Sequence, residues 1–251
     1  MMKSLLFTVL MLIVSVIQGQ VLIHSHNDYE GSEPLFNALR YEAFTVEADV
    51  YLVNGKLAVA HDRKDIDTSR TLSSLYLDPL DSLFKLYKGR VSANKNYRPT
   101  LAIDIKSDGP AVLSEIARLV KTKPEVFDRR KNKNAIQIIV SGDRGPIEQW
   151  TKYPPFIMFD GRPLEHYNEK TLEKVLTISD SYGRYARNNQ LDTAALIKMI
   201  KTAHDHNKLV RLWGAPDEPQ TWILFRRLGV DIINTDKIAE CRAFLADKSN
   251  Q

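Results

Sequence analysis

Two carboxylates lie two residues apart in an apolar, β-branched stretch, Glu47 and Asp49 within Phe44–Val53. Side chains at i and i+2 of a strand point to the same face, so both carboxylates are expected on one side of this strand. Burying them without a partner is costly, and a cation must compensate them. Asp104 lies in the next apolar stretch and supplies a third carboxylate.

Three carboxylates with no thiolate favour a hard divalent cation, Mg²⁺ or Ca²⁺. The alternative is an ion pair between Glu47 or Asp49 and Lys106. Lys106 follows Asp104 by two residues, so it faces the same side and is suited to neutralising an anionic substrate oxygen.

Two histidines are expected at the rim of this site. His24 ends the first predicted strand, and His61 follows the hairpin after the second. Such a pair suits a general acid and a general base. Either one alone also fits a structural histidine. His26 is expected to point to the opposite side of the chain from His24.

Two arginines follow the fourth and fifth predicted strands, Arg144 and Arg162. Arginine forms bidentate contacts with phosphate or carboxylate groups, so these residues are expected to shape the substrate side of the site. The alternative is that they only pair with their neighbours Asp143 and Asp160.

Strands and helices must alternate to position these residues. The pattern predicts strands at Val21–His24, Phe44–Val53, Thr100–Lys106, Ala135–Ser141, Phe156–Phe159, Leu176–Ser179, Leu209–Trp213 and Val230–Asn234, with a hairpin return at Leu57–Ala60. Helices are expected at Pro34–Tyr41, Pro79–Lys88, Pro110–Val120, Ile147–Lys152, Glu169–Val175, Thr193–His206, Pro219–Leu228 and Lys237–Leu245. Eight such units favour a single-domain TIM (β/α)₈ barrel over residues 21–251. An open doubly wound sheet is the alternative, but no Gly-rich phosphate loop follows the first strand.

The first twenty residues are predicted to be a secretory signal peptide. Lys3 is followed by an uncharged run, Leu5–Ile17, and by the small residue Gly19. That run is too short for a membrane span, which needs about 20 residues. Cleavage near residue 20 would give a secreted or periplasmic protein without an integral membrane segment.

Composition excludes several classes of protein. Subtracting 31 acidic residues from 35 basic ones leaves a net charge of +4, and the basic residues are dispersed rather than clustered as in a nucleic-acid binder. The single cysteine, Cys241, excludes an internal disulfide framework and a thiolate-based metal centre. The sequence leaves the oligomeric state open.

The combined motifs resemble the glycerophosphodiester phosphodiesterases of the phospholipase C-like phosphodiesterase superfamily. The resemblance is carried by His24, Phe44–Val50, Asn54-Gly55, His61-Asp62, Trp213 and Gly229–Asp236. Three further stretches are more similar to the altered-inheritance-of-mitochondria branch: His24–Tyr29, Ser141–Arg144 and Phe159–Arg162.

The resemblance implies a TIM barrel that cleaves a small phosphodiester or a phospholipid head group. The implied roles are metal ligation by Glu47, Asp49 and Asp104, acid/base catalysis by His24 and His61, phosphate binding by Lys106, and lining of the cleft by Trp213.

Two positions depart from the diesterase pattern, Ser25 in place of arginine and Asp104 in place of glutamate. The form Asp104-Ile105-Lys106, and Asn27 three residues after the first histidine, are similar to sphingomyelinase D-like relatives, which implies substrate contact by Asn27.

Two other functions stay open. The pair His24 and His26 also opens amidohydrolase-type barrels, in which both bind metal and an aspartate such as Asp236 contributes. Those sites need further histidines after the fifth and sixth strands, where this chain has Asp160 and Asp180. The second alternative is a secreted barrel that binds a ligand without turnover.

Overall fold

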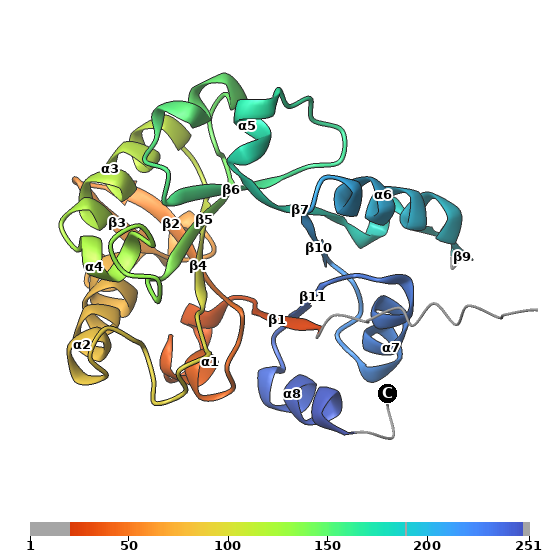
Figure 1. Cartoon of the computed structure of the whole chain (residues 1–251), viewed down its shortest axis with the longest axis horizontal. Helices are drawn as coiled ribbons and strands as arrows, with labels where there is room; N and C mark the ends of the chain where they lie inside the picture. The colour runs from red at the N-terminus through yellow and green to blue at the C-terminus, as the bar shows by residue number, and fades with distance from the viewer. Residues whose placement is uncertain (1–20, 189, 248–251) are drawn as a thin grey trace, which may run out of the picture.

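Eight parallel strands form a closed barrel in a computed structural model that describes residues 21–188 and 190–247 (Figure 1). The strands are β1 Leu22–Ser25, β2 Thr45–Val53, β4 Thr100–Ile105, β5 Gln137–Gly142, β6 Ile157–Gly161, β7 Val175–Ser181, β10 Leu209–Trp213 and β11 Ile232–Thr235. The barrel closes because β1 pairs with both β11 and β2. The predicted TIM barrel is confirmed, and the predicted signal peptide lies outside the described residues.

One hairpin projects beyond the barrel. Strand β3, Lys56–Val59, pairs antiparallel with the end of β2. The two-residue connection has positive φ at both positions, 50° at Asn54 and 75° at Gly55, as a type I′ turn requires. This hairpin brings the chain back toward the barrel mouth, where His61 follows.

The helices are α1 Phe36–Arg40, α2 Asp78–Leu86, α3 Gly109–Lys121, α4 Pro124–Phe127, α5 Glu169–Glu173, α6 Thr193–Asp205, α7 Pro219–Leu228 and α8 Ile238–Ala246. The segment Ile147–Lys152 is a 3₁₀ helix. Helix α4 and the short hairpin β8 Ala186–Arg187 with β9 Gln190–Leu191 were not expected from the sequence. None of the helices in the described part of the chain is long and apolar enough to cross a membrane.

The side chains of β2 divide between two environments. Val46, Ala48 and Val50 are buried in the main hydrophobic core. Glu47 and Asp49 alternate with them and are buried as well. The period-of-two pattern therefore places both carboxylates on the other face of β2, inside the barrel.

Candidate active site

Glu47 lies among nitrogen donors from the end of β1. Its Oε2 accepts a hydrogen bond from the Asn27 backbone N–H at 3.1 Å. The same oxygen lies 3.5 Å from His24 Nε2 and 3.8 Å from His26 Nε2. Burial disfavours the ionised carboxylate, but His24 and the charge of Arg211 outweigh it and hold the pKa of Glu47 below its usual range. Glu47 is therefore ionised at neutral pH.

Asp49 is satisfied on one oxygen only. Its Oδ2 accepts from Tyr29 Oη at 2.8 Å, lies 3.1 Å from His61 Nδ1, and pairs with Lys106 Nζ at 2.6 Å. Its Oδ1 is buried and has no hydrogen-bond partner among the described residues. Burial and the neighbouring charge of Glu47 raise the pKa of Asp49 to about 6.

Asp104 is the third of the three carboxylates, and the register of β2 and β4 places it beside Asp49. Its Oδ1 accepts from Ser141 Oγ at 2.6 Å, and its Oδ2 lies 2.9 Å from Lys106 Nζ. Burial acts to lower the pKa of Lys106, but Asp104 and Asp49 raise it above its usual range. The alternative expected from the sequence, an ion pair with Lys106, is therefore present at Asp49, and Asp104 also pairs with Lys106.

The three carboxylates match a hard cation in their chemistry. All supply oxygen donors, and the unpartnered Oδ1 of Asp49 lacks a positive neighbour that a cation would provide. Among the described residues no group of three His, Cys, Asp or Glu side chains meets the geometry of a metal site. The Lys106 ammonium lies between Asp49 and Asp104 and neutralises them in this arrangement.

His24 and His26 both face Glu47, so the prediction that they point to opposite sides of the chain was wrong. His24 is 1% exposed inside the barrel, and its Nε2 lies 3.3 Å from Arg211 Nη1. Burial and the charge of Arg211 lower the pKa of His24. The expectation that His24 lies at the rim was wrong. Its catalytic role stays a prediction.

His26 lies at the mouth instead, with 32% of its side chain exposed. Its Nδ1 lies 2.9 Å from Asp236 Oδ1, beyond the end of β11. Strand β1 ends at Ser25, and Asn27 has a left-handed backbone with φ 45°. The strict alternation of strand side chains therefore no longer holds at His26. His61 lies on the hairpin side with 54% of its side chain exposed.

Arg211 argues against the amidohydrolase-type arrangement. A metal ion bound by both first-strand histidines would lie beside this guanidinium, which already contacts His24 Nε2. Two like charges at such a distance repel strongly inside a protein.

Asn27 contacts two residues of the site. Its backbone N–H donates to Glu47, and its side-chain Oδ1 accepts from Tyr29 Oη at 3.0 Å. Tyr29 Oη also bonds Asp49 and lies 3.4 Å from His61 Nδ1. Substrate contact by Asn27 stays a prediction. Sequence reasoning had missed Tyr29, and its one signal was its place in the motif after the first strand.

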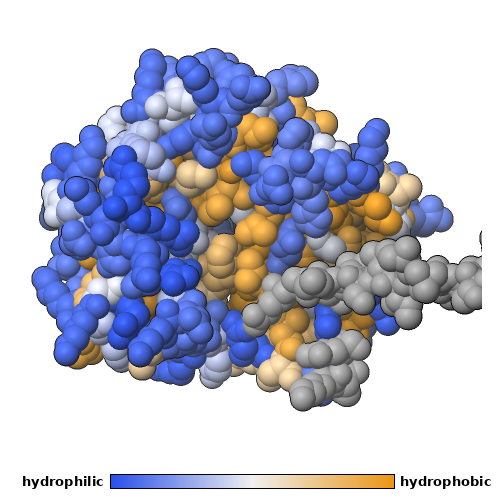
Figure 2. Space-filling view, in the orientation of Figure 1, coloured by the Kyte–Doolittle hydropathy of each residue, from blue (hydrophilic) through white to orange (hydrophobic). Residues whose placement is uncertain are grey.

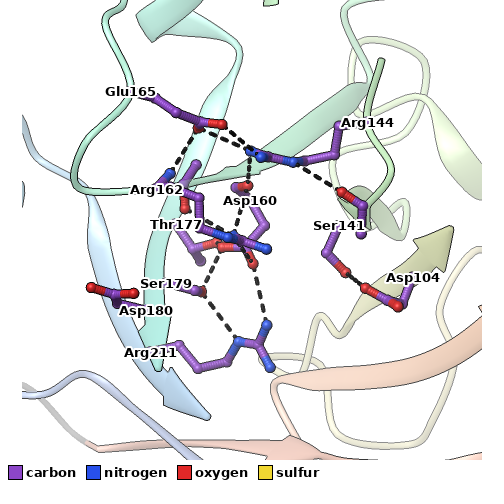
Figure 3. A network of polar contacts seen from close by, with 12 residues as sticks. Asp104, Ser141, Arg144, Asp160, Arg162, Glu165, Thr177, Ser179, Asp180 and Arg211 are labelled. Carbon is purple, nitrogen blue, oxygen red and sulfur yellow. Dashed lines mark hydrogen bonds and ion pairs between the residues drawn. The ribbon is translucent and has the colours of Figure 1, made fainter. Parts of the chain in front are cut away.

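The opposite side of the barrel holds a dense network centred on Asp160 (Figure 3). Its carboxylate accepts from Thr177, Ser179, Arg162 and Arg211. Burial acts to raise the pKa of Asp160, but Arg162 and Arg211 outweigh it and lower the pKa. Arg211 was also missed, although an arginine inside the apolar strand Leu209–Trp213 was a visible signal.

The two predicted substrate arginines have different partners. Arg162 pairs with Asp160 at 2.9 Å, as the alternative anticipated, and its guanidinium lies 4.8 Å from the centre of the Trp213 ring. Arg144 does not pair with Asp143. Its guanidinium makes two hydrogen bonds to Glu165, at 2.6 and 3.0 Å, as Figure 3 shows.

The fold and the sequence both match known phosphodiesterase-like proteins. A protein-family model described as AIM6-like phosphodiesterase domain matches residues 14–142. The model of the glycerophosphoryl diester phosphodiesterase family matches residues 210–239. Altered inheritance of mitochondria protein 6 from Saccharomyces cerevisiae (strain RM11-1a) is 47% identical, covering 86% of this chain and 68% of that protein. The homolog from Arthroderma benhamiae is 24% identical, covering 88% and 83%.

Solved structures agree on the fold. A glycerophosphodiester phosphodiesterase from Parabacteroides distasonis superposes with a TM-score of 0.58 at 19% identity, covering 91% of this chain and 98% of that one. A putative glycerophosphoryl diester phosphodiesterase from Silicibacter pomeroyi gives 0.58 at 13%, covering 91% and 94%. The barrel, the motifs and the relatives point the same way: the chain belongs to the AIM6-like phosphodiesterase domain family.

Proposed function

We propose that this protein is a metal-dependent phosphodiesterase acting on a small phosphodiester or a phospholipid head group, with His26 and His61 as its proton-transfer pair. One observation carries the proposal. The two partly exposed histidines lie beside the buried Glu47–Asp49 pair, His26 next to Glu47 and His61 next to Asp49.

Glu47, Asp49 and Asp104 are the residues that would hold Mg²⁺ or Ca²⁺. The bound cation would supply Lewis acidity toward a non-bridging phosphate oxygen. When Lys106 gives up its place between the two aspartates, its ammonium stays tethered at the same mouth. There it can neutralise a second phosphate oxygen.

The histidines are held in position by carboxylates. Asp236 binds Nδ1 of His26, and Asp49 binds Nδ1 of His61. Nε2 of His61 is therefore left for substrate, and Nε2 of His26 lies 3.8 Å from Glu47 Oε2, beside the proposed cation site. One imidazole takes the proton of the attacking hydroxyl, from water or from the substrate itself. The other gives a proton to the leaving oxygen.

The test is a phosphorus NMR assay on a panel of phosphodiesters, with and without Mg²⁺ or Ca²⁺. We expect His26→Ala and His61→Ala each to lose about 10²–10⁴-fold in turnover. The double variant is expected to lose little more, because the two groups act as a unit. His24→Ala is expected to keep most of its turnover. His204→Ala is the matched control, because His204 also pairs with an aspartate, Asp231, but lies on helix α6.

Each result has a clear meaning. Wild-type turnover in His61→Ala contradicts the whole proposal. Loss of turnover in His24→Ala with full turnover in His26→Ala returns the role to His24, as the sequence alone suggested. A protein that binds phosphodiesters but turns over none of them is the binding-only barrel, which the Lys106 ion pairs with Asp49 and Asp104 would then explain.

Arg162 tests the substrate side of the mouth. Its guanidinium stacks on Trp213 while it pairs with Asp160. We expect Arg162→Ala to change the ratio of kcat/KM between diesters with different head groups more than it changes turnover. An equal loss on every substrate would contradict this assignment.

A further inference from the structure

Helix α6 is much longer than the helix that precedes it in the barrel. The helix has 13 residues, Thr193–Asp205, whereas the preceding helix α5 has only five, Glu169–Glu173. Ala195, Met199 and Ala203 are spaced four residues apart, so they lie on the same face of α6. A one-turn helix is too short to cover a face of that length.

This face of α6 forms the floor of a groove, where Met199 and Ala203 are buried. A cavity of about 500 Å³ lies between α6, strand β7 and the loop that follows β6. We call it the α6 groove. Its apolar lining comes from Pro163, Leu164, Tyr167, Ile178, Met199 and Ala203. Leu164, within this lining, is 73% exposed. Figure 2 shows apolar surface running between hydrophilic patches across this view of the molecule.

The charged residues of the α6 groove are mostly cationic. They are Arg162, Arg184, Lys198 and Lys208, with His166 and His206 beside them. The one carboxylate among the lining residues is Glu165, and Arg144 already binds both of its oxygens.

Two of these cations form no ion pair with a carboxylate among the described residues. Lys208 donates to the carbonyls of Leu172 and Val175, at 2.8 Å each, so its charge has no carboxylate partner among the described residues. Lys198 is exposed and forms no ion pair within the described part of the chain. Arg162 and Arg184 pair with Asp160 and Asp180, so the free positive charge of the rim is that of Lys198 and Lys208. Two free ammonium groups above an apolar floor are complementary to a ligand with an anionic head and an apolar tail.

We propose that the α6 groove binds a single-chain anionic amphiphile, with its alkyl chain along α6 and its carboxylate or phosphate head at the cationic rim. The lining stretch from Ala195 to His206 is about 16 Å long at 1.5 Å per residue, which suits a medium-length chain. The site lies outside the barrel and does not depend on the proposed catalytic function. Arg162 and Glu165 are the lining residues that also belong to the mouth network.

The test is calorimetric titration of the full chain with dodecanoate and with dodecyl phosphate, each below its micelle concentration. We expect binding at one site per chain, at least about tenfold tighter than dodecyltrimethylammonium or butyrate. Tighter binding of the phosphate than of the carboxylate assigns the site to a lysophospholipid-like ligand, and the reverse assigns it to a fatty acid. Equal binding of the cationic amphiphile, or no binding of either anion, overturns the proposal.

Two exposed substitutions with matched controls locate the site. Leu164→Ser is expected to weaken binding about tenfold, whereas Leu86→Ser, at a leucine 69% exposed on α2, leaves it unchanged. Lys198→Glu is expected to weaken it about threefold to fivefold. Its control is Lys201→Glu, because Lys201 lies on the same helix but is not part of the lining.

The variants also separate this site from the barrel mouth. His61→Ala is expected to bind dodecanoate as the wild type does, whatever its turnover. Wild-type binding by both Leu164→Ser and Lys198→Glu overturns the placement in the α6 groove. Loss of dodecanoate binding in His61→Ala overturns it as well, because the ligand would then lie in the barrel mouth.

Discussion

Asp49 on β2 and Asp160 on β6 are both buried carboxylates inside the same barrel, yet their surroundings differ. Asp160 accepts from two hydroxyls and two guanidinium groups. Asp49 has one oxygen with no partner among the described residues and a second carboxylate, Glu47, two residues away. The pKa of Asp160 is lowered, and that of Asp49 is raised.

The difference suggests which of the two carboxylates serves stability and which serves binding or reaction. A buried charge that is fully paired contributes to a specific structure, and removing its partner is strongly destabilising. A buried carboxylate left partly unpaired costs stability, and such costs concentrate where a protein binds or reacts. We therefore expect loss of a charge to destabilise the β6–β10 side more than the β1–β4 side.

The largest expected effect is on the scaffold side. Asp160→Asn removes the charge that Arg162 and Arg211 share, leaving Arg211 buried beside His24. We expect the free energy of unfolding to fall by about 3–5 kcal/mol at pH 7, measured by urea denaturation. A loss below about 1 kcal/mol would show that the network is not a stabilising one.

The opposite sign is expected at Asp49. Its folded pKa of about 6 exceeds the usual 3.8, so the folded state binds more protons and stability falls as pH rises between these values. The charge therefore costs at most about 3 kcal/mol at neutral pH. In EDTA, Asp49→Asn should unfold at higher urea than the wild type at pH 7.5, with the gap closing by pH 4.

The pH series distinguishes the two sides directly. Asp160 has a lowered pKa, so its stabilising contribution is present at neutral pH and declines as pH falls through the acidic range. The stability that Asp160→Asn loses relative to the wild type should therefore become smaller as pH falls. The stability that Asp49→Asn gains should become smaller as well, so the two variants differ in the sign of their effect. Parallel curves for wild type and Asp49→Asn at every pH would contradict the raised pKa.

Metal binding should act on the β1–β4 side alone. Mg²⁺ at about a hundredfold excess over its Kd should stabilise the wild type by about 2.7 kcal/mol. Thermal unfolding with and without EDTA measures this. Asp160→Asn is expected to keep the response and Asp49→Asn to lose it. Lys106→Met should respond at lower Mg²⁺, since its ammonium no longer lies between Asp49 and Asp104. An equal response in Asp49→Asn would place the metal elsewhere.

The smallest expected loss of stability is at Ser141 on β5, whose hydroxyl contacts Asp104 on β4. Ser141→Ala removes one hydrogen bond to Asp104 Oδ1 and should cost about 1 kcal/mol. Urea denaturation measures this. Ser114→Ala is a suitable control, because Ser114 bonds only a helix carbonyl on the surface. An equal cost for both variants would mean that Ser141 has no special part in the site.

Much of this fold followed from local pattern, because alternating strands and helices with an Asn54-Gly55 turn leave few architectures. Glu47 and Asp49 were placed correctly because β2 stays regular through both. His26 was not, because β1 ends at Ser25 and the backbone turns left-handed at Asn27. Arg144 found Glu165, 21 residues away, through a loop whose path no periodicity encodes.

The β2–β3 hairpin makes one histidine of the proposed pair separable from the barrel. His61 follows a strand that pairs, among the described residues, with β2 and at Thr71, whereas His26 follows a strand that closes the barrel. A descendant that shortened this hairpin would lose one histidine while all eight barrel strands kept their neighbours. Within such a lineage, enzymes and binding-only barrels would differ by one short insertion rather than by their folds.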